Sequence, residues 1–263
     1  MGWQGVLRHW TYVPVGESLS DREVRHGYWQ FGRRSSPRAV TEPVHYRPSP
    51  GLFLDAIPLG TQDQVSDEVE RQRVDQWCEL LPTLTEVKQL WLYSFVPKRL
   101  LDAALQMPQL ETLFVKWGNT ENLDRLSELS NLRHLHLGGL SQVTNIDVLG
   151  TLAGLITLEI EDFKRVDDFA PLAALPQLEG LSLDGSIWNT QNIQTLAPIG
   201  ELTSLRRLTL LNAQVQDKSL DPLLKLKHLE AFHSARWYPD SEFAKLRELP
   251  NLRQGNPYEK RRE

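Results

Sequence analysis

The chain has 263 residues, a hydrophobic content of 40% and a net charge of −5, values typical of a soluble globular protein with a substantial core. The acidic balance argues against a nucleic-acid-binding surface, because such surfaces are usually basic. A single cysteine, Cys78, excludes an intrachain disulfide and fits a reducing compartment. The sequence has no signal-peptide pattern at MGWQGVLRHW and no apolar run of about 20 residues. We therefore expect a cytoplasmic protein without a membrane partner.

Residues 1–60 are rich in aromatic residues, are punctuated by proline and glycine, and carry no repeat. GVLRHWTYVPV and GYWQFG have the composition of strands, whereas residues 32–50 are polar, proline-rich and basic, as in a loop or linker. We expect an N-terminal cap packed on the first repeat or, alternatively, a separate small domain. Its aromatic side chains are expected to form its core.

Residues 61–86 are expected to contain a capping helix. The stretch VSDEVERQRVDQWCELL (65–81) places Val69, Trp77 and Leu81 on one face, with charges on the opposite face. Val74 and Cys78 join that apolar face. Cys78 is therefore expected to act as a small apolar side chain and not as a nucleophile.

One pattern recurs through residues 87–251: apolar, two variable, apolar, one variable, apolar. It reads VKQLWL at 87–92, LETLFV at 110–115, LRHLHL at 132–137, LITLEI at 155–160, LEGLSL at 178–183, LRRLTL at 205–210 and LEAFHS at 229–234. Successive copies start 23, 22, 23, 23, 27 and 24 residues apart, and a degenerate copy starts at Leu252. Residues 252–263 become polar and basic, so we expect a C-terminal cap or tail there.

These segments resemble leucine-rich repeats, whose period is about 20–29 residues, and the intervening sequence is similar to that of bacterial internalin-like repeats. The resemblance implies a right-handed α/β solenoid, with a parallel sheet on the concave face and helices on the convex face. In IDVLGTLAGL, DDFAPLAALPQL and LDPLLKLKHL, Asp147, Asp168 and Asp221 are expected to be the helix N-caps, with Pro171 and Pro222 in the first turn.

The sequence departs from the repeat consensus at the ninth position, where asparagine or cysteine is usual. The residues found there are Phe95, Gly118, Leu140, Phe163, Ser186, Ala213 and Trp237. An asparagine ladder would satisfy buried backbone groups in the turn after each strand. Without it, local hydrogen bonds or apolar stacking, as at Leu140 and Phe163, are expected to hold the turns.

Side chains alternate along a strand, so the variable residues between the leucines are expected to face outward on the concave surface. This surface would be aromatic at its N-terminal end and would carry histidines and then carboxylates at its centre. The residues expected to bind a partner are Trp91, Tyr93, Phe114, Lys116, Trp117, His134, His136, Glu159, Glu161, Asp162, Asp184, Arg207 and His233. Exposed tryptophan and tyrosine are typical of interface hot spots. In the alternative interpretation, the N-terminal region folds back and covers the aromatic residues.

The fifth spacing is long because DGSIWNTQN (184–192) adds about four residues to the usual period. Insertions in solenoids form loops on one face, often the face that binds. Trp188 is therefore expected either to contact a partner or to fill the widened turn.

Enzymatic alternatives have weaker support in the sequence. His134, His136 and Glu159 could in principle hold zinc, but residues two apart on a strand lie about 6.6–7 Å apart, which is wide for one ion. We expect no metal, no cofactor and no catalytic residue. Late basic residues (Arg206, Arg207, Lys225 and Lys227) are interpreted as solvated charge and not as a nucleic-acid site.

The sequence favours a non-catalytic protein-binding scaffold, monomeric when free, that uses its concave face. A sharper hypothesis is a bacterial immunity protein whose acidic residues occupy the basic surface of a toxin. The alternatives are a metal-dependent hydrolase built on His134, His136 and Glu159, and a regulatory adaptor of an endogenous enzyme.

Overall fold

The computed structural model describes residues 17–27, 39–58, 65–234 and 238–257. The expected strands in GVLRHWTYVPV and GYWQFG lie outside these ranges apart from Gly27, as does Trp237. No helix within the described part of the chain is long and apolar enough to cross a membrane.

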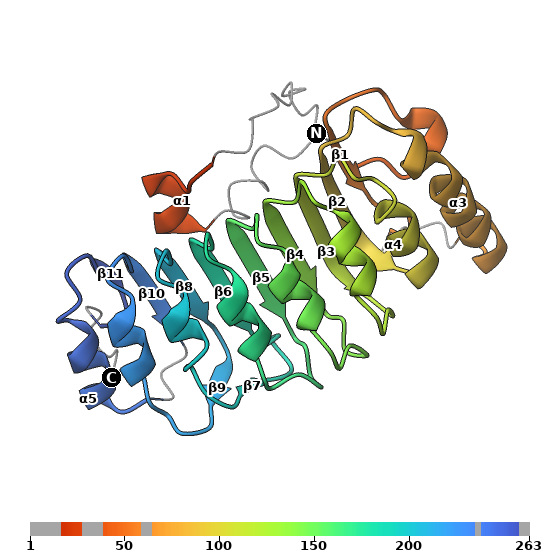
Figure 1. The fold of residues 1–263 in the computed structure, drawn as a ribbon. Helices are drawn as coiled ribbons and strands as arrows, with labels where there is room; N and C mark the ends of the chain where they lie inside the picture. The colour runs from red at the N-terminus through yellow and green to blue at the C-terminus, as the bar shows by residue number, and fades with distance from the viewer. Residues whose placement is uncertain (1–16, 28–38, 59–64, 235–237, 258–263) are drawn as a thin grey trace, which may run out of the picture.

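A parallel nine-stranded sheet in the order β1-β2-β3-β4-β5-β6-β8-β10-β11 forms one layer of the fold. Short helical turns form the other layer (Figure 1). This arrangement confirms the predicted leucine-rich repeat solenoid. The strands are β1 (Gly51–Leu54), β2 (Gln89–Val96), β3 (Thr112–Gly118), β4 (His134–Gly138), β5 (Thr157–Glu161), β6 (Gly180–Asp184), β8 (Arg207–Leu210), β10 (Ala231–Ser234) and β11 (Gln254–Gly255).

The repeated leucines form the core because neighbouring strands pair in register. Leu113, Leu135, Leu158 and Leu181 stand opposite one another on β3 to β6, and none is more than 2% exposed. One unit cannot bury its own leucines, so each depends on the units beside it. Full burial of such a side chain contributes roughly 1.5–3 kcal/mol.

The convex layer consists mainly of single 3-10 turns where the sequence predicted helices. These turns are η3 (Asp124–Glu128), η4 (Asp147–Thr151), η5 (Ala170–Ala174), η6 (Ile199–Glu201) and η7 (Asp221–Lys225). The longer α-helix α4 (Lys98–Ala104) follows β2, and α5 (Asp240–Leu246) follows β10. Pro171 and Pro222 lie at the start of η5 and η7, as expected.

The expected N-caps are wrong at all three positions, because the N-cap residues of these turns are Ile146, Phe169 and Leu220. Asp168 accepts the backbone N–H of Ala170 at 2.8 Å, whereas Asp147 and Asp221 are the first residues inside their turns. In four units a side chain two residues before the turn accepts the N–H of the turn's first residue, namely Asn122, Asn145, Asp168 and Ser219. In the long unit Thr195 accepts the N–H of Ala197, two residues before η6. These hydrogen bonds therefore recur from unit to unit, as the strands do.

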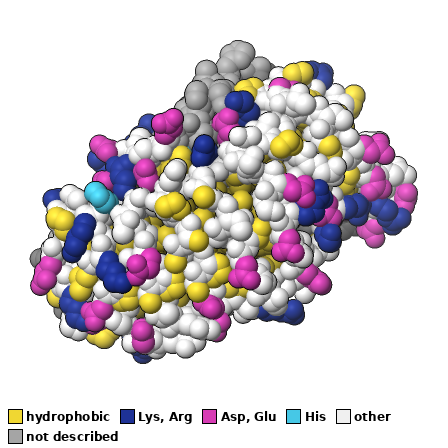
Figure 2. All heavy atoms as spheres, viewed as in Figure 1, with side chains coloured by type: hydrophobic (Ala, Val, Ile, Leu, Met, Phe, Trp, Pro, Cys, Tyr) yellow, Lys and Arg dark blue, Asp and Glu magenta, His cyan; other side chains and the backbone are white. Residues whose placement is uncertain are grey.

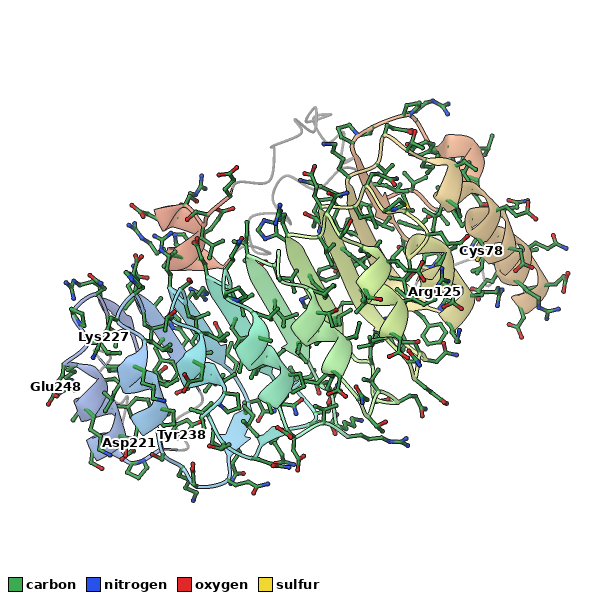
Figure 3. The ribbon with its side chains drawn as sticks, viewed as in Figure 1. Cys78, Arg125, Asp221, Lys227, Tyr238 and Glu248 are labelled. Atoms are coloured by element: carbon green, nitrogen blue, oxygen red, sulfur yellow. The ribbon has the colours of Figure 1, made fainter. Side chains whose placement is uncertain are left out.

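The N-terminal end of the sheet is covered by α3 (Asp67–Leu80), in which Val74 and Trp77 are buried. Trp77 Nε1 donates a hydrogen bond to the Thr41 carbonyl at 2.7 Å. Cys78, which is labelled in Figure 3, is partly buried and packs against the core. Val69 was expected on the buried face but is 44% exposed, because it lies in the first turn and misses the sheet.

The sheet extends beyond both ends of the recognisable repeat. β1 precedes α3 in sequence and pairs in parallel with β2. The repeat pattern predicted the first strand at residue 87, whereas the first strand of the sheet lies earlier in the chain. The short η1 (Pro43–His45) precedes β1, and η2 (Leu81–Thr83) follows α3. At the other end β11 pairs with β10, so the degenerate copy at Leu252 forms a last unit where a polar tail was expected.

The turns without asparagine are held as the sequence predicted, by apolar packing and local hydrogen bonds. Leu140, Phe163 and Ala213 are fully buried. In the long unit, β7 (Gln191–Ile193) pairs with β9 (Ala213–Val215) in a second small sheet. The buried Gln191 side chain accepts the N–H of Phe163 at 3.0 Å and donates to the Val166 carbonyl at 2.7 Å. Gln191 thus satisfies backbone groups in that turn that an asparagine of the repeat consensus would otherwise bond.

Candidate protein-binding site

Four of the expected contact residues are not presented to solvent. Trp91, Phe114, His134 and His136 are 6%, 4%, 2% and 7% exposed, so the expectation that they line an open surface is wrong. In a parallel sheet in register, side chains of the same column lie side by side and cover one another. Trp91 and Phe114 also form a cluster against which Phe53 of β1 packs.

The two histidines of NLRHLHLGGL have separate partners. His134 Nδ1 lies 2.7 Å from Thr157 Oγ1, and burial, with a smaller effect of Arg133, lowers the pKa of His134 to about 3. His136 stacks on Phe114 with ring centroids 4.1 Å apart, and its Nδ1 lies 3.1 Å from Glu159 Oε2. Because their rings turn to different neighbours, they do not converge on one point.

No group of three or more histidine, cysteine, aspartate or glutamate side chains that could hold a metal ion occurs among the residues that the structure describes. The zinc-hydrolase alternative therefore has no geometric support in the described part of the sheet.

The exposed aromatic residues lie near the carboxyl ends of the first two repeat strands. Tyr93 is 41% exposed and contacts the Phe53 ring at 4.9 Å between centroids. Trp117 is 38% exposed and packs edge-on against Phe95 at 5.2 Å, while Lys116 beside it is half-buried. These residues are accessible to a partner, in contrast to Trp91 and Phe114.

A cavity of about 220 Å³ lies on the concave face between β3 and β8. It brings together six of the expected residues, namely Phe114, His136, Glu159, Glu161, Asp184 and Arg207. It also has six lining residues that the sequence did not single out for this site, namely His26, Gly27, Ile160, Ser182, Thr209 and Leu211. Trp91, Tyr93, Lys116, Trp117, His134, Asp162, Trp188 and His233 do not line it.

Asp184 dominates the electrostatics of the cavity. Burial, followed by the repulsion of Glu159 and Glu161, raises the pKa of Asp184 to about 7, although two hydrogen bonds oppose this shift. Those bonds come from Ser182 Oγ at 2.5 Å and from the backbone N–H of Leu211 at 2.6 Å. The cavity therefore gains negative charge as the pH rises through neutrality.

Arg207 borders the cavity but directs its donors away from the carboxylates. Its Nη1 donates to the carbonyls of Val24 at 2.8 Å and Arg25 at 3.2 Å. Burial lowers the pKa of Arg207, against the opposing effect of Glu159 and Asp184. The interpretation of Arg206 and Arg207 as solvated charge was wrong, because Arg206 is also engaged, with Nε 2.6 Å from Glu230 Oε1.

The inserted loop stands beside the cavity and presents two apolar side chains. Ile187 and Trp188 are 86% and 85% exposed, so Trp188 does not fill the turn. Ser186 Oγ accepts the N–H groups of Trp188 and Asn189 at 3.2 and 3.1 Å. The Asn212 amide, which donates to the Ser186 carbonyl at 2.6 Å, ties the loop to the next unit.

The loop is continuous with the cavity wall. Gly185 N donates to the carbonyl of Leu211, which is 50% exposed and lines the cavity. The Asp162 carboxylate reaches the loop through Asn189 at 3.3 Å, and burial raises the pKa of Asp162.

His233 is half-buried on β10. The Lys and Arg side chains on the face drawn in Figure 2 are interspersed with Asp and Glu.

The repeat sequence and the nine-stranded parallel sheet define the chain as a leucine-rich repeat solenoid protein. No protein-family model matches the sequence, and no curated protein matches it. Among solved structures, the chain is similar to an internalin (inlF) from Listeria monocytogenes, with 20% identity and a TM-score of 0.47, over 66% of this chain and 55% of that chain. It thus spans about half the length of that internalin.

Two further solved structures are similar over the same share of the chain. Internalin C2 from Listeria monocytogenes has 19% identity and a TM-score of 0.48, over 67% of this chain and 73% of that chain. A leucine-rich repeat protein from Leptospira interrogans has 21% identity and a TM-score of 0.41, over 66% and 50%. Identities this low leave function to be argued from the site itself.

Proposed function

We propose that the protein is a non-catalytic interaction scaffold that binds a basic protein partner at the acidic cavity of its concave face. The observation that carries this proposal is the convergence of Glu159, Glu161 and Asp184 on one cavity, with an exposed apolar loop beside it. A lysine or arginine of the partner would enter the cavity, and its apolar neighbours would pack on Trp188.

The partner that best fits this chemistry is a basic enzyme or toxin, which the chain would neutralise in the manner of a bacterial immunity protein. Negative potential on the concave face would steer a basic partner and raise its rate of association. Since a bound cation favours the ionised form of Asp184, binding would strengthen as the pH rises through about 7. A regulatory role toward an endogenous basic enzyme would use the same surface.

The test uses the purified chain as bait in an extract of its own source, followed by titration of the captured protein by calorimetry. Glu159→Lys plus Glu161→Lys is expected to weaken binding at least a hundredfold, because charge-paired interface residues contribute several kcal/mol. The matched control is Glu79→Lys plus Glu248→Lys, the same charge change at two exposed sites away from the cavity (Figure 3 for Glu248). Equal loss in both double variants, or none in the first, would refute the proposal.

A further inference from the structure

Residues 17–27, here named the strap, contact the rim of the sheet formed by the amino-terminal ends of β5, β6 and β8. These strands are far from the strap in sequence. The strap contains α1 (Asp21–His26), seen beside the sheet in Figure 1. Leu19 N donates to Glu179 Oε2 at 2.8 Å across 160 residues of sequence. Arg206 and Arg207 make further contacts across 182 to 187 residues. The surface that receives the strap is the rim groove, formed by Ile156, Glu179, Gly180, Arg206, Arg207 and Ala231.

The rim groove recognises the main chain of the strap at Leu19. Glu179 Oε2 accepts the N–H of Leu19 and also the Ser18 hydroxyl at 2.9 Å. Arg206 Nη1 donates to the Leu19 carbonyl, and its Nη2 lies 3.3 Å from Asp21 Oδ1. The Arg206 and Glu179 side chains are only 19% and 15% exposed. Hydrogen bonds to charged groups with little water nearby are stronger than neutral ones.

An apolar socket receives the strap's side chains. Leu19 and Val24, 4% and 1% exposed, form with Ile156 and Ala231 a cluster separate from the main core. Gly180 lets Leu19 approach, since a Cβ at that position would lie 3.2 Å from Leu19 Cδ1. The strap is thus anchored by a small apolar cluster that is separate from the leucine core of the repeats.

The socket interrupts a column of charged residues. The second residue of each repeat copy reads Lys88, Glu111, Arg133, Ile156, Glu179, Arg206, Glu230 and Arg253. In that column the apolar Ile156 stands where Leu19 packs. The change from charge to isoleucine at this one unit, beside a glycine on the next strand, is what a site for an apolar side chain requires.

The helix of the strap depends on the rim groove. α1 has six residues and begins with a capping box in which Ser20 and Glu23 bond each other's backbone N–H. Isolated helices shorter than about 12–15 residues are marginal in water. Arg207 supplies a cation to the last carbonyls of α1, at Val24 and Arg25, where the helix dipole favours positive charge.

We propose that the rim groove is a peptide-binding site, occupied in the free protein by the chain's own strap acting as a releasable latch. It selects a leucine followed by an N-capped helical turn, with a valine five residues after the leucine. Because His26 and Gly27 line the acidic cavity, release of the strap removes one wall of that cavity. The proposal stands on contacts within the chain and does not depend on the partner of the cavity.

The test releases the strap in the full-length chain by Leu19→Asp, or independently by Val24→Asp, both outside the main core. Hydrogen exchange of residues 17–27 is expected to rise to that of a free peptide, with the exchange of the repeats unchanged. A fluorescein-labelled peptide of sequence ESLSDREVRHG is then expected to bind the Leu19→Asp chain saturably by fluorescence anisotropy. Binding to the wild-type chain should be at least tenfold weaker, because its own strap occupies the groove.

The controls separate recognition from general adhesion. Adding Glu179→Ala to the Leu19→Asp chain is expected to abolish peptide binding. Adding Glu111→Ala, a carboxylate in the same column three units away, should leave it unchanged. Equal binding to wild-type and Leu19→Asp chains, no binding to a chain whose strap exchanges freely, or a strap still protected in both release variants would each overturn the proposal.

Discussion

Asp184 couples the folded state to the pH of the medium, and Asp184→Asn removes its ionisation with little change of shape. The asparagine carbonyl can still accept the Leu211 N–H, and its amide can donate to the Ser182 hydroxyl, so both contacts of the carboxylate persist. The substitution removes only the group that binds and releases a proton. We therefore expect the variant to differ from the wild type chiefly in how stability depends on pH.

The magnitude follows from the pKa shift of Asp184, from 3.8 to about 7. The folded protein binds the proton more tightly than the unfolded chain, so this stabilisation is complete below pH of about 4 and is lost as the pH rises through 7. With these two pKa values, the free energy of unfolding contributed by Asp184 falls by about 3 kcal/mol between pH 5 and pH 8.5.

The assay is urea denaturation followed by circular dichroism at several pH values between 5 and 8.5. The two proteins differ only at this residue, so the difference between wild type and Asp184→Asn reports the loss of its ionisable carboxyl. The variant should gain about 2–3 kcal/mol relative to the wild type across this range. A difference that stays constant with pH would show that the proton of Asp184 is not held in the folded state.

Three further predictions concern single side chains. Gln191→Ala should lower the free energy of unfolding by about 2–3 kcal/mol in urea denaturation, because buried backbone groups lose their partners, whereas the exposed neighbour Asn192→Ala should change it by less than about 0.5 kcal/mol. Trp188→Ala should leave the stability unchanged within about 0.5 kcal/mol but remove a water-exposed component of tryptophan fluorescence, and a loss of several kcal/mol would contradict the exposed loop. Burial raises the pKa of Cys78, so at pH 8 it should react with a disulfide reagent more slowly in the native protein than in urea, and equal rates would argue against its packing.

The periodic sequence predicted the sheet and its core because both depend on near neighbours. Leucines at a fixed period, such as Leu135 and Leu158, must pair in register, and the side-chain hydrogen bonds of Asn145 and Asp168 recur with them. The exposure of the outward residues could not be predicted from alternation. Trp91 is buried because Phe114 and Phe53 flank it, and Phe53 lies on a strand that has no repeat signature.

The acidic part of the site was predictable in composition but not in enclosure. Glu159, Glu161 and Asp184 were expected on one face and do share a cavity. The walls come from Leu211, at the end of a later strand, and from His26, in a segment without any repeat. The sequence does carry one signal of the strap's position, because the alternating charges of the second repeat position break at Ile156.

Leucine-rich repeat arrays are ordinarily one-dimensional, since each unit touches only the next and folding can spread from any point. The strap makes this chain an exception. Residues 17–27 emerge early during synthesis, yet Glu179, Arg206 and Arg207 are made 160 to 187 residues later. The strap must therefore wait for most of the solenoid before it can dock, and contacts of such long range slow the final step of folding. A docked strap therefore indicates that the units from β5 to β10 have already folded.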